Sequence, residues 1–397
     1  MTFSSIRIVL IFSIILASLS SCQSSAKKES RIPTKQPASS TSSDFEVYLP
    51  EGNQPKNGWS LLVAIDPHGS GVTASKHLKE AVTAYPAVLV ASNQIQNNDP
   101  NFMAELDELI ADARKRYPVS GRVYLAGFSG GARMALAYAG SHRVSGVIAA
   151  GAFAQPDELR TIPCPVIGIV GMDDFNFSEA AQYFFKPELL PANAHVELTH
   201  ASHEWPSADR LAETWGWFQL SNESNKNKLT NYLQEQKQRI DSLTQAGDFL
   251  QAVCSSRNMT SVPAFESLVR FSKKTDELTS SDAYQQQLEA LGKSLQFEMN
   301  TRQELAQALF EKDEAWWTSE IGVLHEKAET EPDVIQQMAY KRLTGFLGII
   351  CYSYSRQFVA RGDAAHLEQV LTVYRLAEPN NPDMQHFTEE LKRLQQP

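Results

Sequence analysis

One serine of this sequence is placed where a hydroxyl group can attack a carbonyl carbon. Ser129 lies in Gly127-Phe-Ser-Gly-Gly131, between an apolar run that begins at Val123 and a run of small residues that reaches Tyr138. The pattern G-x-S-x-G between a strand and a helix is typical of a nucleophile on a sharp turn. The flanking glycines are needed because Cβ atoms would clash in so tight a turn. The sequence therefore predicts a strand, a turn at Ser129 and a helix.

A serine hydroxyl is a weak nucleophile, and two later segments offer the base and the acid that could activate it. Residues 163–174 have the pattern of a buried strand that ends in the carboxylates Asp173 and Asp174. Residues 195–206 have the pattern of an alternating strand followed by a loop with His203. The chain order serine, aspartate, histidine differs from the orders in the chymotrypsin and subtilisin types.

Other residues of these segments compete for the same roles. His195 opens the alternating strand and is expected to face solvent, whereas His200 lies at the end of that strand. His203 is favoured because it lies in the loop beyond, from which an imidazole can reach back over a sheet. Only one of Asp173 and Asp174 can serve as the acid, because neighbouring residues of an extended segment point in opposite directions.

Residues 44–220 resemble a compact α/β-hydrolase domain of the esterase or dienelactone-hydrolase-like kind. The resemblance implies a mostly parallel sheet. The sequence departs from the family pattern in two respects: its first strands look abbreviated, and no long insertion follows the sixth strand to form a lid. Four motifs, in the order expected for the family, carry the resemblance: Asp66-Pro-His-Gly-Ser-Gly71, Gly127-Phe-Ser-Gly-Gly131, Gly171-Met-Asp-Asp-Phe175 and Ser202-His-Glu-Trp-Pro206.

The resemblance also implies which acid is used. The family usually keeps its acid three residues after the glycine of the third motif, which favours Asp174 and leaves Asp173 turned toward solvent or the backbone. The implied catalytic residues are then Ser129, Asp174 and His203. In this arrangement the imidazole takes the serine proton, and the carboxylate fixes the imidazole tautomer.

An oxyanion forms when a serine attacks an ester, and backbone N–H groups commonly stabilise it. The resemblance places one donor at Gly130 and another in the turn at Gly69 and Ser70. His68, in the same loop, is interpreted as a structural neighbour of these donors and not as a metal ligand.

The amino-terminal residues predict export to the bacterial cell envelope. Residues 1–21 hold one positive charge and a short apolar run, which is typical of a secretory signal peptide. Leu19-Ser-Ser-Cys22 resembles the lipoprotein box, in which the cysteine carries lipid such as palmitate; the alternative is an ordinary signal peptide with an unrelated cysteine. Residues 22–43 are polar and predict a flexible tether from the membrane, with the protein facing the periplasm or the cell surface.

Composition narrows the partners further. The formal net charge of −10 and the lack of a basic stripe argue against a nucleic-acid partner. No zinc-ligand spacing and no nucleotide-binding fingerprint occur, so neither a metal nor a cofactor is expected. After Cys22 three cysteines remain, Cys164, Cys254 and Cys351. They are interpreted as buried apolar residues, and a bridge between Cys254 and Cys351 stays open.

Residues 221–397 predict an all-α domain. Apolar residues recur at helical spacing, as at Leu288, Leu291 and Leu295, and the turn-like breaks leave room for six to eight helices. The stretch from Arg361 to Leu394 faintly resembles a helical hairpin of the tetratricopeptide type. The pair Trp316-Trp317 is interpreted as an anchor between helices.

Two functions are consistent with these observations. The first is a membrane-tethered serine hydrolase, a carboxylesterase acting on a small-molecule or glycan-linked ester through an acyl-enzyme, with peptidase and thioesterase activity left open. The second is a binding or scaffold lipoprotein. In that case the helical domain recruits a protein partner and the hydrolase domain is degenerate or regulatory.

Overall fold

The computed structural model describes residues 39–41, 44–221, 223 and 226–396. The predicted signal peptide, the predicted lipidation site Cys22 and most of the predicted tether lie outside the described residues. Within the described ranges, no helix combines the length and the apolar character needed to cross a membrane.

The centre of the fold is an eight-stranded sheet with the order β1-β2-β4-β3-β5-β6-β7-β8. Neighbouring strands in the series β4-β3-β5-β6-β7-β8 pair in parallel, whereas β2 is antiparallel to both β1 and β4. The prediction of a mostly parallel sheet is confirmed. The strands are β1 (Ser39–Thr41), β2 (Phe45–Tyr48), β3 (Trp59–Ile65), β4 (Ala87–Ser92), β5 (Val119–Phe128), β6 (Gly146–Ala150), β7 (Val166–Gly171) and β8 (Ala194–Thr199).

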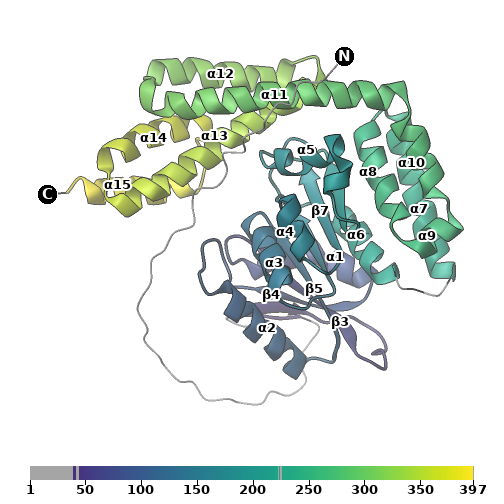
Figure 1. Ribbon diagram of the computed structural model, residues 1–397. Helices are drawn as coiled ribbons and strands as arrows, with labels where there is room; N and C mark the ends of the chain where they lie inside the picture. Colours follow the sequence, from purple (N-terminus) through teal and green to yellow (C-terminus); the bar gives the residue numbers. More distant parts are fainter. Residues whose placement is uncertain (1–38, 42–43, 222, 224–225, 397) are drawn as a thin grey trace, which may run out of the picture. The chain divides into compact units, whose positions relative to one another are not determined.

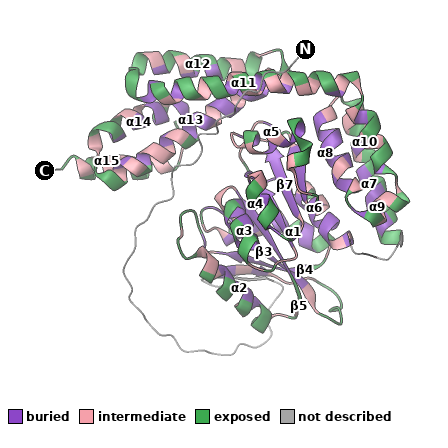
Figure 2. Cartoon of the chain, viewed as in Figure 1, coloured by how far each residue is buried: buried purple, intermediate pink, exposed green. Residues whose placement is uncertain are grey.

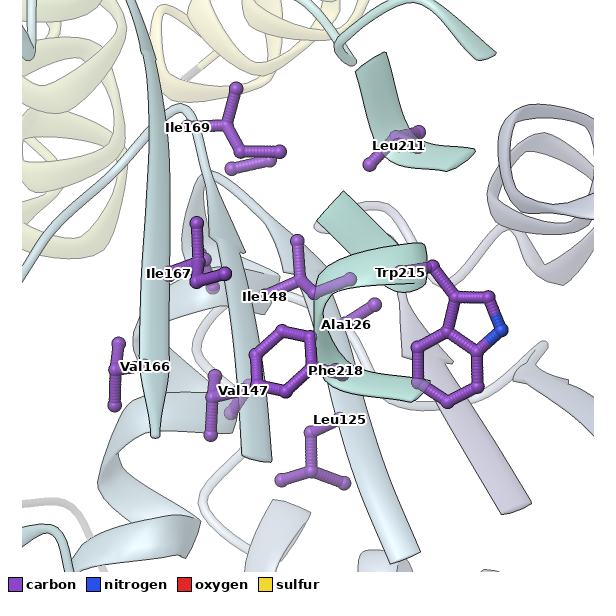
Figure 3. Packing of buried hydrophobic residues seen from close by; sticks show 14 of the residues in the cluster. Leu125, Ala126, Val147, Ile148, Val166, Ile167, Ile169, Leu211, Trp215 and Phe218 are labelled. Carbon is purple, nitrogen blue, oxygen red and sulfur yellow. The ribbon is translucent and has the colours of Figure 1, made fainter. Parts of the chain in front are cut away.

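The strands β4, β6 and β7 contain no polar side chain except Ser92, because helices cover both faces of the sheet. Every residue of β4, β6 and β7 is buried, as the purple strands of Figure 2 show. On one face, Trp215 and Phe218 pack over the strands (Figure 3), and the Trp215 ring lies 4.9 Å from that of Tyr124. This packing fixes the sheet and therefore the edge at which its parallel strands end.

Helices of the first half lie in two groups with the sheet between them (Figure 1). Helix α1 contacts α6 on one side, and α3 contacts α2 and α4 on the other. Their bounds are α1 (Gly71–Ala84), α2 (Phe102–Arg116), α3 (Gly130–Ser141), α4 (Pro156–Thr161), α5 (Phe177–Phe185), the 3-10 helix η1 (Pro187–Leu189) and α6 (Ala208–Leu220).

The described residues after 225 form nine helices, more than the six to eight predicted. Three boundaries carry no glycine or proline. At two of them Ser281 and Asp313 accept a hydrogen bond from the first turn of the next helix, whereas Arg270 before α10 forms no such cap. The helices are α7 (Lys226–Gln245), α8 (Phe249–Thr260), α9 (Pro263–Leu268), α10 (Phe271–Thr279), α11 (Asp282–Glu311), α12 (Glu314–Thr330), α13 (Val334–Arg361), α14 (Ala364–Ala377) and α15 (Asp383–Leu394).

The buried hydrophobic residues of the described chain form two separate cores. The first begins at the sheet, continues through α7 to α10 and reaches Leu291 in α11. The second begins at Leu305 of α11 and is completed by α12 to α15, with Trp317 fully buried in it. Helix α11, 30 residues long, therefore joins the sheet-containing core to the second core.

The three cysteines of the described chain are buried and free. The bridge between Cys254 and Cys351 is not formed, and the interpretation as small apolar residues agrees with their burial. Burial raises the pKa of the Cys164 thiol to about 11, so this thiol is protonated and unreactive near neutral pH.

Candidate active site

The sheet brings the predicted site segments to one edge. Parallel strands end at the same side of a sheet, so the loops after β3, β5, β7 and β8 lie along a common border. These are the loops that contain Asp66, Ser129, Asp174 and His203.

Ser129 occupies the turn between β5 and α3 in a backbone conformation that L-residues rarely adopt. Its φ of 52° makes it one of two non-glycine residues with positive φ in the described chain. The turn is tight, since a Cβ at Gly127 would collide with the carbonyl of Gly131, and one at Gly131 with the carbonyl of Ile65. The Ser129 N–H donates to the Ala150 carbonyl at 2.7 Å, which fixes the turn to β6.

His203 lies between Ser129 and Asp174. Its Nε2 is 2.8 Å from the Ser129 Oγ, and its Nδ1 is 2.9 Å from both carboxylate oxygens of Asp174. An ionised carboxylate only accepts hydrogen bonds, so Nδ1 carries the hydrogen and Nε2 accepts from the serine hydroxyl. Asp174 is fully buried, whereas 21% of the His203 side chain is exposed. Two rings hold the imidazole, Phe175 at 4.2 Å and Phe128 at 4.8 Å between centroids.

Asp173 does not turn toward solvent or the backbone as predicted. Only 13% of its side chain is exposed, and its Oδ2 lies 3.1 Å from the Lys341 ammonium of α13. The prediction was wrong because a helix from the carboxy-terminal half covers this loop. Asp173 and Asp174 have different partners, Lys341 and His203, but they lie in a turn closed by the Asp174 N–H on the Gly171 carbonyl and not on an extended segment.

Neither of the other two histidines approaches Ser129. His195 was expected to face solvent and is instead buried against Trp217, at 5.1 Å between ring centroids, because α6 packs on this strand. Burial lowers the pKa of His195 to about 4. His200 lies 2.7 Å from the Asp248 carboxylate at the start of α8, and this hydrogen bond raises its pKa.

The two helix starts beside Ser129 offer backbone donors. Ser70 caps α1 and Gly130 is the first residue of α3, and N–H groups at such positions have no acceptor within the helix. The Gly69 N–H, also predicted as a donor, is already bound to the Asp66 carbonyl at 3.1 Å. Gly69 contributes its φ of 67°, which turns the loop toward Ser70.

Asp66 holds the loop after β3 to the loop that contains His203. Its carboxylate accepts the Trp205 Nε1–H at 2.9 Å and the His68 backbone N–H at 2.9 Å. Burial raises the pKa of Asp66, but hydrogen bonds from His68 and Trp205 outweigh it, so the pKa lies below its ordinary value. The hydrogen bond to Asp66 also raises the pKa of His68, whose side chain is 80% exposed.

Sequence reasoning missed three residues of this region. Asp66 and Trp205 stood within the quoted motifs without a role, and only the fold reveals that they meet. Asn97 had no signal at all. Its backbone N–H donates to the Pro67 carbonyl at 2.8 Å, and its side-chain amide lies against Gly130, where it would collide with any Cβ.

No cluster of three or more His, Cys, Asp or Glu suited to a metal ion occurs among the described residues. The contacts at the site join a hydroxyl, an imidazole and a buried carboxylate.

Comparisons with known proteins give likenesses in structure only. No family model matches the sequence. No curated protein matches it either. The fluorophosphonate-binding serine hydrolase FphF of Staphylococcus aureus is 10% identical, with a TM-score of 0.36 over 44% of this chain and 91% of its own. An esterase of Pyrobaculum calidifontis is 12% identical, with a TM-score of 0.35 over 44% and 80%. An esterase domain of a Rhodothermus marinus protein is 17% identical, with a TM-score of 0.34 over 43% and 88%.

The class of fold follows from the chain itself. A mostly parallel sheet with helices on both faces, an antiparallel β2, and a serine on a strained strand-to-helix turn define the α/β-hydrolase fold. The first half of the chain has this fold, and a helical region follows it.

Proposed function

We propose that this protein is a serine hydrolase that cleaves esters through an acyl-enzyme, with Ser129 as nucleophile, His203 as base and Asp174 as acid. One observation carries the proposal: the unbroken contact from the Ser129 hydroxyl through His203 to a buried carboxylate. A structural serine would need no such partner.

The reaction runs in two steps. Ser129 Oγ attacks the ester carbonyl while His203 Nε2 takes its proton, and the imidazolium is stabilised by Asp174. The N–H groups of Gly130 and Ser70 face the developing oxyanion. His203 then gives the proton to the leaving alkoxide, and a water activated by the same nitrogen releases the acid and restores Ser129.

The test is covalent labelling with a fluorophosphonate probe, followed by hydrolysis of short-chain p-nitrophenyl esters. Ser129→Ala should lose labelling and lose on the order of 10⁶-fold in kcat, because no other group can form the acyl-enzyme. Ser141→Ala, a change at the exposed end of α3, is the matched control and should label like the unchanged protein. Labelling that persists in Ser129→Ala would place the nucleophile elsewhere.

We further propose that the enzyme is attached to the cell envelope by lipid on Cys22. The support is the sequence pattern Leu19-Ser-Ser-Cys22 and the polar segment after it. Cys22→Ser should move the protein from the membrane fraction to the soluble fraction, because this change removes the lipid chains, two or more of which are enough for stable attachment. Unchanged fractionation of this variant, measured by immunoblot, would contradict lipid anchoring.

A further inference from the structure

Two arginines of the helical region bind the loop that carries Asp174. Arg342 of α13 donates from Nη1 to the Met172 carbonyl at 2.6 Å. Arg302 of α11 donates from Nη2 to the Phe175 carbonyl, also at 2.6 Å. These two carbonyls bracket the acidic pair, so the loop is held on both sides of Asp174. The loop is therefore tied to α11 and α13 as well as to β8 and the segment after it, where the Thr199 and Ala201 carbonyls accept the Met172 and Asp173 N–H groups.

The two guanidinium groups are themselves fixed. Glu298 of α11 lies 2.7 Å from Arg342 Nε and 2.6 Å from Arg302 Nη2. Arg342 and Glu298 are 1% and 2% exposed. In addition, Arg342 lies over the Phe177 ring at 4.9 Å, and Arg302 over the Phe346 ring at 4.8 Å. A planar guanidinium held by such contacts has little freedom, and its donors are pre-oriented.

The charges of this cluster balance only when Asp174 is included. Arg342 is a buried cation and Arg302 a half-buried one, whereas Glu298 is a single buried anion. Burial lowers the pKa of Arg302, and both Glu298 and Asp174 act in the opposite direction. A buried charge without a partner is strongly unfavourable, so the fourth member, the fully buried Asp174, completes a neutral set.

The same loop transmits this position to the imidazole. Phe175 packs on the His203 ring at 4.2 Å, and a Cβ at Gly345 of α13 would lie 3.2 Å from the Phe175 ring. Phe175 is thus held between α13 and His203. Both the acid and the ring beside the base are placed by contacts from the helical region.

A second polar cluster provides a contrast. Glu197 of β8 lies 3.9 Å from Arg210 and 3.7 Å from Arg239, and Asn258 of α8 donates to it at 2.7 Å. This cluster also joins the sheet to the helical region. It has no hydrogen bond to Ser129, Asp174 or His203 among the described residues, so it offers a control for the cluster at the acid.

We propose that Arg302 and Arg342 are positioning residues for the acid: they fix the loop from Met172 to Phe175 and complement the charge of Asp174, so that ester hydrolysis requires the helical region. This inference rests on the proposed function. The helical region then serves as part of the catalytic architecture and not only as a surface for a partner.

The experiment compares Arg302→Met and Arg302→Lys with Arg239→Met in the full chain. Arg239 is a matched control, because 14% of its side chain is exposed against 15% for Arg302. We expect Arg302→Met to lower kcat by roughly 10²-fold with little change in KM, since a displacement of about 1 Å has this effect. Arg302→Lys, which keeps the charge and should fold in any case, is expected to recover part of the loss. Arg239→Met should lower the thermal midpoint and leave kcat near that of the unchanged protein.

A spectroscopic readout separates this inference from the proposed function. The His203 Nδ1 proton, bonded to Asp174, should give a low-field proton resonance that is assigned by its loss in Asp174→Asn. We expect the resonance to shift or broaden in Arg302→Lys and to persist in Arg239→Met. An unchanged resonance and an unchanged kcat in Arg302→Lys would overturn the positioning role. An unchanged protein without esterase activity would refute the proposed function, while the resonance would still decide whether Arg302 positions the acid.

Discussion

The nucleophile and the acid of this site are positioned by different parts of the molecule. Ser129 is held by its own neighbourhood: the turn between β5 and α3, two glycines without room for a Cβ, and one hydrogen bond to β6. The loop that carries Asp174 has local hydrogen bonds too, such as that from the Asn176 N–H to the Asp174 carboxylate, but side chains from helices far along the chain bind it on both sides of the acid. The nucleophile side is thus encoded locally, and the acid side depends on tertiary contacts.

On the acid side, the largest effect is expected from a change at Asp174 itself. Asp174→Asn should lower kcat by roughly 10⁴-fold, because an amide at this place favours the imidazole tautomer that cannot accept the serine proton. The fold should change little, since the amide fills the same volume. Steady-state kinetics with p-nitrophenyl acetate and a thermal unfolding curve measure the two quantities.

Asp173→Asn is the matched control for this change. It removes the same charge one residue away and weakens the pair with Lys341, but it leaves the contact between Asp174 and His203 in place. A much smaller loss of kcat is expected. Equal losses for the two variants would show that the net charge of the loop, and not the contact with His203, supports catalysis.

A smaller effect is expected where the loop after β3, which contains Asp66, meets the loop that contains His203. Trp205→Phe removes the indole N–H that donates to Asp66. Among the described residues no other side chain of the loop that contains His203 donates to this carboxylate, so a buried oxygen is left unpaired. We expect a loss of about 1–3 kcal/mol in the free energy of unfolding. Urea unfolding near pH 7, followed by tryptophan fluorescence and circular dichroism, measures it.

The pH dependence of this loss has a definite sign. The pKa of Asp66 is lowered in the folded state, so its contribution is present above the unfolded value of about 3.9 and is lost as pH falls through the folded value. The difference between the unchanged protein and Trp205→Phe should therefore shrink below about pH 4. A difference that stays constant down to pH 3 would mean that ring packing, and not the hydrogen bond, is what Trp205 contributes.

The contrast between the two sides explains what sequence could predict. Gly127, Ser129 and Gly131 lie within five residues, and their spacing reflects one tight turn, so a motif reports it. The parallel sheet could be predicted in the same way, because strands that are buried on both faces have mostly apolar sequences. The order of the motifs along the chain placed the candidates for acid and base on neighbouring strand ends.

The contacts of the acid loop could not be predicted. Arg302 is 127 residues from Phe175, and Arg342 is 170 residues from Met172. Charged residues on a helix usually face solvent, and nothing in the local pattern distinguishes these two from solvated ones. The same tertiary covering explains why Asp173, expected to be solvated, is paired instead with Lys341.

The smallest expected effect concerns His200, which lies between the acid loop and the start of α8. Its Nε2 is 2.7 Å from Asp248, whose hydrogen bond raises its pKa; burial and Lys341 act against this, and Asp173 adds to it. Because the pKa is raised in the folded state, the stabilisation is complete below the unfolded value of about 6.5 and is lost as pH rises through the folded value.

His200→Gln should therefore lower the free energy of unfolding by a few tenths of a kcal/mol at about pH 5.5, and by less at about pH 9. The small size follows from the 54% exposure of the side chain, which allows water to screen the pair. Asp248 also caps α8, so a double-mutant cycle with Asp248→Asn is needed to isolate the pair from the cap. A coupling energy that is the same at both pH values would show that the imidazole binds Asp248 without its charge. The contact would then be a neutral link between β8 and α8, and only the acid loop would join the two halves through ion pairs near the site.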